Sequence, residues 1–399
     1  MVKERNSEKH IIFLSVYPLN ESFFIDRFGF ETWKKRGFQI HIINIAGIIY
    51  PHVIDQLPEY LVKNKNYGFQ QLVIYTRKQL TSYLKSLTGE KYSIPIGFRA
   101  NEVVSIYTET DTKYIVLRNH IVDLSHHYNV FELIIRNVLS YNISGLIQNV
   151  IQKFSDKYSL TFLDNKKINS PFMIGASRHE LKKISLDYKD SILVNIKAFD
   201  KVRYEKDLKR VKPAFIEPQE YYVLLTNHPW QIHDNILMQY KEQITKDQYS
   251  LIINRFLGAV EKILKKPILI AAYPKCTDDE NIYQGRPFLK DTNMLVRFSK
   301  GVITHHTNAI NFAVLNDKPL CLIGLNDLNR FSEFNLYTRA YSRELDLPLY
   351  FIGSKSSNSF ISKNMFSKDS KKYQEFKEKF LSSDNEDQNI FEEIINNLS

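Results

Sequence analysis

Short apolar runs alternate with longer amphipathic stretches at the start of the chain. Residues 11–16 (IIFLSV) are rich in β-branched side chains and precede a polar turn, which predicts a buried strand. Residues 21–36 carry large apolar side chains at helical spacing, and Gly37 stands where a helix C-cap is expected. Residues 38–45 (FQIHIINI) predict the next strand. Strand, helix and strand in this order indicate a βαβ unit and therefore a parallel sheet.

The middle of the chain gives weaker signals. Stretches that predict helices lie at 70–87 and 130–154. Short apolar runs that predict strands lie at 103–107, 115–117, 171–174 and 192–196. The charged segment 201–219 ends near two prolines, so we interpret it as a linker and place a domain boundary near residue 215. It holds the main local concentration of basic residues, namely Lys201, Arg203, Lys206, Lys209, Arg210 and Lys212.

A second alternation follows the linker. Predicted strands lie at 221–225, 267–272, 301–304 and 320–323, and predicted helices at 247–265, 294–298 and 309–315. This order is typical of a second doubly wound α/β unit. We therefore predict an α/β protein with a first domain at 1–215 and a second at 216–370. Residues 371–399 are expected to form a charged C-terminal helix.

Composition narrows the function classes. The 399 residues are 43% hydrophobic and 13% aromatic, enough to build packed cores and to exclude a disordered chain. Two cysteines cannot build a disulfide framework, and no apolar run approaches the roughly 18 residues of a membrane span. We therefore expect a cytoplasmic protein. A net charge of +10 favours an anionic partner, although a solvated Lys-rich surface explains the charge equally well. No RNP1-like string or zinc-finger spacing favours nucleic acid.

The string after the strand at 301–304 is the most informative one for chemistry. This strand runs into His305-His306-Thr307-Asn308 and then into an apolar helix. A helix that begins at the carboxyl end of a parallel strand presents free N–H groups to an anion such as phosphate. We expect Thr307 or Asn308 to be the N-cap and His305 to add a donor. In the alternative reading, Thr307 only caps the helix and the histidines only fill space.

These residues resemble the nucleotide-sugar site of GT-B glycosyltransferases, in particular bacterial surface-polysaccharide (capsule or lipopolysaccharide) transferases. In that group a strand ends in a Ser/Thr-His step, and a Lys-Pro pair precedes the next strand. The matching residues here are Thr304, His305, Thr307, Asn308, Lys318 and Pro319. At 271–275 (AAYPK) the chain departs from the family's His-Pro-basic motif, because Tyr273 replaces the expected His. Residues 285–286, 291–292 and 221–234 resemble further loops of the family.

The resemblance implies two Rossmann-like domains that face each other across a cleft, with the donor held by the C-terminal one. It implies no required metal, and no G-x-G-x-x-G follows the first strand to indicate a dinucleotide cofactor. It also implies that the C-terminal helix packs back on the first domain. The expected donor-binding residues are Lys275, Arg286, Thr292, Thr304, His305, His306, Thr307 and Asn308. An inverting reaction needs a general base, for which the candidates are His233, Asp234, Asp200 and Glu21.

Three functions stay open at this point. The leading hypothesis is a glycosyltransferase that moves a sugar from a UDP-hexose or CMP-activated acidic sugar to a surface polysaccharide or lipid-linked acceptor. For such an enzyme the basic charge suits peripheral attachment to the inner face of the membrane. The alternatives are a nucleotide-sugar epimerase on the same fold and a non-catalytic scaffold that binds polyanions or membranes. The base of the nucleotide and the stereochemistry are not fixed by the sequence.

Overall fold

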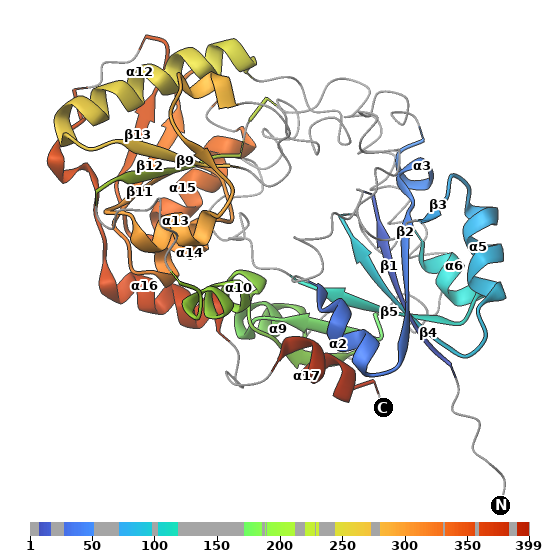
Figure 1. Cartoon of the computed structure of the whole chain (residues 1–399). Coiled ribbons are helices and arrows are strands. Elements are labelled where there is room, and N and C mark those ends of the chain that lie inside the picture. Colours follow the sequence, from blue (N-terminus) through green and yellow to red (C-terminus); the bar gives the residue numbers. More distant parts are fainter. Residues whose placement is uncertain are drawn as a thin grey trace, which may run out of the picture. The chain divides into compact units, whose positions relative to one another are not determined.

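The computed structural model divides the chain into two compact units, each with its own parallel sheet (Figure 1). The structure describes residues 8–16, 28–51, 72–97, 103–118, 171–185, 188, 190–211, 220–227, 229–230, 244–272, 280–329, 332–355, 359–382 and 389–398. The described residues of the first unit come from Met1–His120, Val150–Phe199 and Ser382–Ser399. Those of the second come from Asp200–Leu381.

The first unit is built on a seven-stranded sheet in the order β3-β2-β1-β4-β5-β6-β7. All of its strand pairs are parallel. The strands are β1 (Lys9–Ser15), β2 (Phe38–Asn44), β3 (Leu72–Val73), β4 (Glu90–Ile96), β5 (Thr112–Leu117), β6 (Met173–Ala176) and β7 (Ile192–Asn195). The parallel pairing of β1 with β2 confirms the βαβ opening predicted from the sequence.

Helices connect these strands, as parallel pairing requires. They are α2 (Phe30–Lys35), α3 (Ala46–Ile49), α5 (Arg77–Ser86), α6 (Val104–Glu109) and α9 (Arg178–Ile184). The strand predicted at 103–107 is wrong, because these residues lie in and next to α6. Helix α6 connects β4 to β5, and its apolar side chains Val104, Ile106 and Tyr107 are buried. The stretch 130–154 lies outside the described residues.

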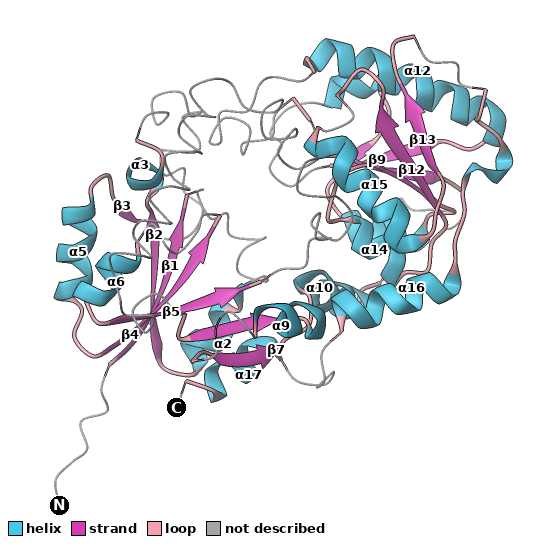
Figure 2. Cartoon of the chain, turned by 180° about the vertical axis from the view of Figure 1, so that it is seen from behind, coloured by secondary structure: helices cyan, strands magenta, loops and turns pink. Residues whose placement is uncertain are grey.

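The second unit is built on a six-stranded parallel sheet in the order β10-β9-β8-β11-β12-β13. The strands are β8 (Tyr222–Leu225), β9 (Ile268–Ala271), β10 (Phe288–Leu289), β11 (Val302–Thr304), β12 (Leu320–Leu325) and β13 (Leu349–Ile352). Its helical segments are α12 (Lys246–Leu264), η4 (Glu280–Tyr283), α13 (Thr292–Phe298), α14 (Ile310–Leu315), α15 (Glu333–Leu345), η5 (Lys363–Met365), α16 (Ser370–Phe376) and η6 (Lys377–Leu381). In each unit the strands lie between helices (Figure 2).

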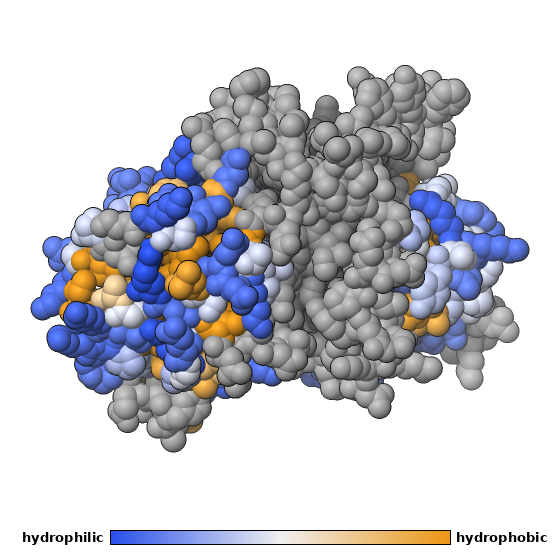
Figure 3. Space-filling view, turned by 90° about the horizontal axis from the view of Figure 1, so that it is seen from above, coloured by the Kyte–Doolittle hydropathy of each residue, from blue (hydrophilic) through white to orange (hydrophobic). Residues whose placement is uncertain are grey.

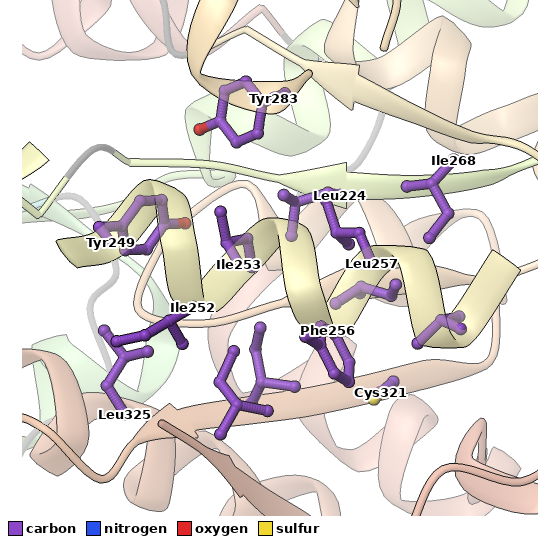
Figure 4. Packing of buried hydrophobic residues seen from close by; sticks show 14 of the residues in the cluster. Leu224, Tyr249, Ile252, Ile253, Phe256, Leu257, Ile268, Tyr283, Cys321 and Leu325 are labelled. Atoms are coloured by element: carbon purple, nitrogen blue, oxygen red, sulfur yellow. The ribbon is translucent and has the colours of Figure 1, made fainter. Parts of the chain in front are cut away.

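Helix α12 covers one face of the second sheet. A capping box at Thr245 and Gln248 starts the helix by pairing backbone N–H groups that would otherwise lack partners. Its buried side chains, including Phe256, pack on Leu224 of β8 and Ile268 of β9 (Figure 4). Full burial of each large apolar side chain contributes about 1.5–3 kcal/mol. This core therefore fixes the strands whose carboxyl ends carry the site described below.

The segment expected to be a linker is partly a helix. Residues Phe199–Leu208 form α10, and from Asp200 onward they group with the second unit. The helix is held by contacts remote in sequence: Arg210, just beyond its end, pairs with Asp291, and Asn293 of α13 donates to Asp207. The charged composition suggested a linker exposed to solvent. In the structure, however, Asp207 and Arg210 bind residues of the second unit.

The C-terminal tail also differs from a single helix. Residues through η6 belong to the second unit, whereas α17 (Ile390–Asn396) belongs to the first. There Arg36 Nε donates to Glu392 Oε2 over 2.7 Å, and the Tyr92 hydroxyl donates to the Leu398 carbonyl.

Few of the described large apolar side chains are exposed. On the face that Figure 3 shows, hydrophilic side chains surround smaller apolar areas. Among the described helices, none combines the length and the apolar character that crossing a membrane requires.

Candidate functional site

The order of the second sheet reverses between β8 and β11, which are neighbours at its centre. Open parallel sheets bind ligands outside the carboxyl ends of their strands, at the point where the strand order reverses. Leu225 ends β8 and lies opposite Thr304, which ends β11. The polar residues that follow these two strands are thereby brought side by side, in the place where the topology favours a ligand.

A side chain after β8 connects the two strand ends. Asn227 donates a hydrogen bond from its amide nitrogen to the backbone carbonyl of His306. The amide oxygen of Asn227 and the hydroxyl of Thr226 accept no hydrogen bond within the described ranges, although both residues are at least nine-tenths buried. Buried polar atoms normally have a partner, supplied by protein, water or ligand. Two such atoms at this edge of the sheet therefore mark a place for a polar ligand.

His305 is held inside the protein. Its exposed fraction is 1%, and its Nε2 lies 3.1 Å from the hydroxyl of Tyr249 on α12. The rings of His305 and Phe334 lie 4.6 Å apart between centroids. Burial raises the pKa of Tyr249, so its hydroxyl stays protonated and able to donate. His305 thus lies behind the strand end, fixed in orientation by α12.

The next three residues make separate contacts. His306 is half-buried and stacks on Tyr337 of α15, with ring centroids 4.6 Å apart. Thr307 Oγ1 accepts from the backbone N–H of Ala309 over 3.3 Å. Asn308 Oδ1 accepts from the Tyr341 hydroxyl over 3.4 Å. His306 and Asn308 are therefore the members of this string with side chains nearest to solvent, because Thr304, His305 and Thr307 are buried.

The helix that follows differs from expectation. α14 has six residues, and its N-cap is Ala309, without a side-chain cap, rather than Thr307 or Asn308. A helix of this length aligns few peptide dipoles. The side chains and loops around the strand ends, rather than a long helix dipole, define the site.

Asp200, a residue of α10, contacts the beginning of α14. Its Oδ2 accepts from Nδ2 of Asn311 over 2.8 Å, and Asn311 is buried in the first turn of α14. Burial raises the pKa of Tyr341, and electrostatic interaction with Tyr337 and with the negative charge of Asp200 raises it further. Since Tyr341 also binds Asn308, the structure brings Asp200 to the same helix end as the expected donor-binding residues.

Other candidates lie elsewhere in the second unit. Arg286 is paired with Glu261, which also accepts from the backbone N–H of Ile268 at the start of β9. This places Arg286 at the amino end of the sheet, opposite the strand ends described above. Thr292 opens α13 after the edge strand β10, three places from β11. The ammonium of Lys318 donates to the Ser299 carbonyl. The structure does not bring these residues into the group around Asn227.

Four candidates fall outside the described residues, namely Glu21, His233, Asp234 and Lys275. The described ranges also contain no group of three His, Cys, Asp or Glu side chains placed to hold a metal ion.

Sequence reasoning gave no role to Tyr249 and Asn311, and it included Asn227 only as a member of the loop 221–234 that resembles the family. Tyr249 occupies an apolar position of a helix and so looked like an ordinary core residue. Asn227 lay within a polar loop without distinction from its neighbours. Asn311 carried the clearest signal, because it is the only polar residue within the apolar helix 309–315.

No family model matches the chain, and no curated protein matches it by sequence. Solved structures do match. Arabidopsis thaliana UGT89C1, complexed with UDP, is 10% identical, with 98% of this chain and 99% of that chain covered and a TM-score of 0.50. A UDP-glucosyltransferase from Polygonum tinctorium is 12% identical, with the same coverage and a TM-score of 0.49. The UDP-GlcNAc 2-epimerase of Methanocaldococcus jannaschii is also 12% identical over 98% and 99% of the chains, with a TM-score of 0.46.

At these identities the likeness shows the fold. The chain has the two parallel-sheet α/β domains of the GT-B fold, with seven and six strands.

Proposed function

We propose that this chain is a GT-B glycosyltransferase that binds a nucleotide-activated sugar at the carboxyl ends of β8 and β11. The observation that carries the proposal is the Asn227–His306 bridge at the reversal point, flanked by the unsatisfied buried oxygens of Thr226 and Asn227. An amide oxygen accepts hydrogen bonds and a hydroxyl both accepts and donates, so this edge suits a ligand rich in hydroxyl and phosphate groups. The UDP in the Arabidopsis structure of the same fold supports a nucleotide as that ligand.

The reaction needs groups that stabilise the departing nucleotide phosphate. A hydrogen-bond donor aimed at developing negative charge lowers the barrier most when it is held in place before the reaction. We assign this role to His306, which Tyr337 holds by stacking, and to the loop through Asn308. His305 supports them from behind, and Lys275 remains a proposed donor contact.

We propose Asp200 as the general base of an inverting transfer. Its carboxylate is oriented by the amide of Asn311, and a positioned carboxylate is a suitable proton acceptor for a sugar hydroxyl. Glu21, His233 and Asp234 remain alternative bases. The proposed acceptor is a surface polysaccharide or lipid-linked glycan at the inner face of the membrane, and the net charge of +10 supports an anionic environment of this kind.

A thermal-shift panel of UDP, GDP, CMP, CDP and dTDP tests the donor site. We expect one nucleotide to stabilise the protein, by about 2.7 kcal/mol at 100 times its dissociation constant. Asn227→Ala should weaken this binding about tenfold or more, because a bridge at the site is lost. The matched control is Asn364→Ala, which removes an exposed amide of the same unit. Absence of any shift, or equal affinity in the Asn227→Ala and control proteins, would refute the proposal.

An activity assay then separates the two enzyme classes on this fold. With donor and an acceptor glycan, a glycosyltransferase releases the nucleotide, and Asp200→Asn should lower turnover while donor affinity stays within about threefold. Conversion of the donor sugar to its epimer without acceptor would instead identify an epimerase.

A further inference from the structure

A cavity lies beside the carboxyl end of the edge strand β10, and Asn227 is not among the residues that line it. It has a volume of about 370 Å³ and is lined by Arg203, Arg210, Leu289, Lys290, Asp291 and Leu295. Small-molecule sites span about 300–1,000 Å³, so this volume suits a ligand of monosaccharide size. The cavity lies entirely within the second unit. Its arginines come from the basic segment to which the proposed reaction gives no role.

The two arginines are held in place by Asp207. This carboxylate is 1% exposed and accepts from Arg203 Nε over 3.0 Å and from Arg210 over 3.1 Å. Burial alone would raise the pKa of Asp207, but hydrogen bonds from Asn293 and Arg210 and the charge of Arg203 outweigh it and lower the pKa. Asp207 therefore stays ionised, and the guanidinium groups are ordered before any ligand arrives. Such ordering reduces the entropy lost on binding.

The cavity wall carries an excess of positive charge. Arg210 forms a two-pronged ion pair with Asp291, at 3.0 and 2.5 Å. With Asp207, this pairing offsets two of the three cationic charges. Lys290 is exposed and forms no ion pair with any described residue. One cation is thus left for a ligand, next to the half-buried apolar side chain of Leu289.

We propose that this cavity binds an anionic monosaccharide unit, held through its carboxylate or phosphate by Lys290, beside the two paired arginines. The charged group would face Lys290, and the sugar ring would lie against Leu289. Guanidinium and ammonium groups bind both kinds of anion, so the shared chemistry defines the ligand class. The inference deepens the proposed function. It rests on that function in one respect, namely that the anionic unit belongs to a glycan substrate.

Isothermal titration of the intact chain with glucuronate, glucose 6-phosphate, glucose and inorganic phosphate tests the site. We expect saturable binding of the first two, none of glucose, and weaker binding of inorganic phosphate. Lys290→Gln should weaken binding about tenfold or more, because a charge-assisted contact is lost. Lys290 is exposed, so this variant is expected to fold. The matched control, Lys209→Gln, removes the same charge from an exposed position of the same segment outside the cavity and should bind as wild type.

A repeat of the titration with saturating UDP separates this site from the donor site. Binding of the anionic sugar that persists with UDP supports the inference. If the protein binds no nucleotide but still binds the anionic sugar, the proposed function fails and this inference stands. Three results would overturn it: no binding of either anionic sugar, equal weakening by Lys290→Gln and Lys209→Gln, or displacement of the anionic sugar by UDP. If inorganic phosphate binds as tightly as glucose 6-phosphate, the assignment of the cavity to a sugar ring is overturned.

Discussion

At the scale of single residues, the bond between His305 and Tyr249 shows how the strand end of β11 is fixed from behind. Both side chains are fully buried, so removal of the Tyr249 hydroxyl takes away the partner of His305 Nε2 in an apolar surrounding. We expect Tyr249→Phe to lower the free energy of unfolding by about 1–3 kcal/mol. Urea unfolding measures it. Tyr350→Phe is the control, because Tyr350 packs against the same core and its hydroxyl has no hydrogen bond within the described part of the chain. Equal effects of the two changes would contradict the role of the bond.

A second residue-scale feature lies at the amino ends of β1 and β2. His10 Nε2 lies 2.7 Å from the Thr88 carbonyl and so carries the proton, which leaves His10 Nδ1 to accept from His41 Nε2 over 3.0 Å. His41 Nδ1 lies 2.8 Å from the Tyr83 hydroxyl. Burial first, and then the neighbouring His10, lower the pKa of His41 from 6.5 to about 4.

The lowered pKa of His41 predicts a pH dependence of stability. The unfolded chain takes up the proton near pH 6.5 and the folded chain only near pH 4, so stability is present above 6.5 and is lost as the pH falls through this window. One proton gives a slope of at most about 1.4 kcal/mol per pH unit. Urea unfolding at several pH values measures the slope of the free energy of unfolding against pH. We expect His41→Gln to reduce the slope. An unchanged slope in His41→Gln would exclude His41 as its source.

At the scale of elements, α17 docks on the first unit through a close approach to Gly29. This glycine has φ = +61°, and a Cβ added to it would overlap the Phe391 ring. Gly37 also has a positive φ of +80°, but open space surrounds its added Cβ. At both positions an added side chain would therefore be strained by the backbone, and only at Gly29 would it also meet α17.

This pair gives a matched prediction. We expect Gly37→Ala to lower stability by about 1–2 kcal/mol, the cost of a left-handed L-residue. Gly29→Ala should cost at least about 1–3 kcal/mol more, because it also overpacks the Phe391 contact. Thermal and urea unfolding measure both. In a Phe391→Ala background the difference between the two glycine variants should shrink, and a difference that persists there would place its cause outside α17.

The elements differ in how far local sequence defines them. β8 and β11 lie where their apolar runs predicted, because a strand buried on both faces needs a continuous apolar run. α10 was missed because its stabilising partners, Asp291 and Asn293, are more than 80 residues away. The residues of the candidate site also differ in how far local sequence reveals them. The string after β11 and the loop 221–234 that holds Asn227 were both visible in sequence. The bonds from Asn227 to His306 and from Tyr249 to His305 join residues 79 and 56 positions apart and could not be recognised from local pattern.

At the scale of the whole molecule, the chain contains two cores that share a GT-B architecture but draw on different segments. The second unit is continuous from Asp200 to Leu381 in the part described, and the proposed donor site and the anionic cavity both lie in it. The first unit needs the C-terminal residues as well, because α17 supplies buried side chains and the ion pair to Arg36. Ligand and tail should therefore act on different units.

This division leads to a prediction that one hydrogen-exchange experiment tests. Saturating UDP should slow amide exchange in β8 and β11, because ligand binding to the folded state stabilises the unit that holds the site. Exchange in β1 and β4 should not change. Deleting residues 389–399 should speed exchange in β1 and β4, since the buried side chains of α17 and the Leu398 carbonyl that binds Tyr92 are lost. The effect of UDP on β8 should persist in the truncated chain. Loss of that effect on truncation, or slowing of β1 by UDP, would show that the two units respond to ligand and tail as one body.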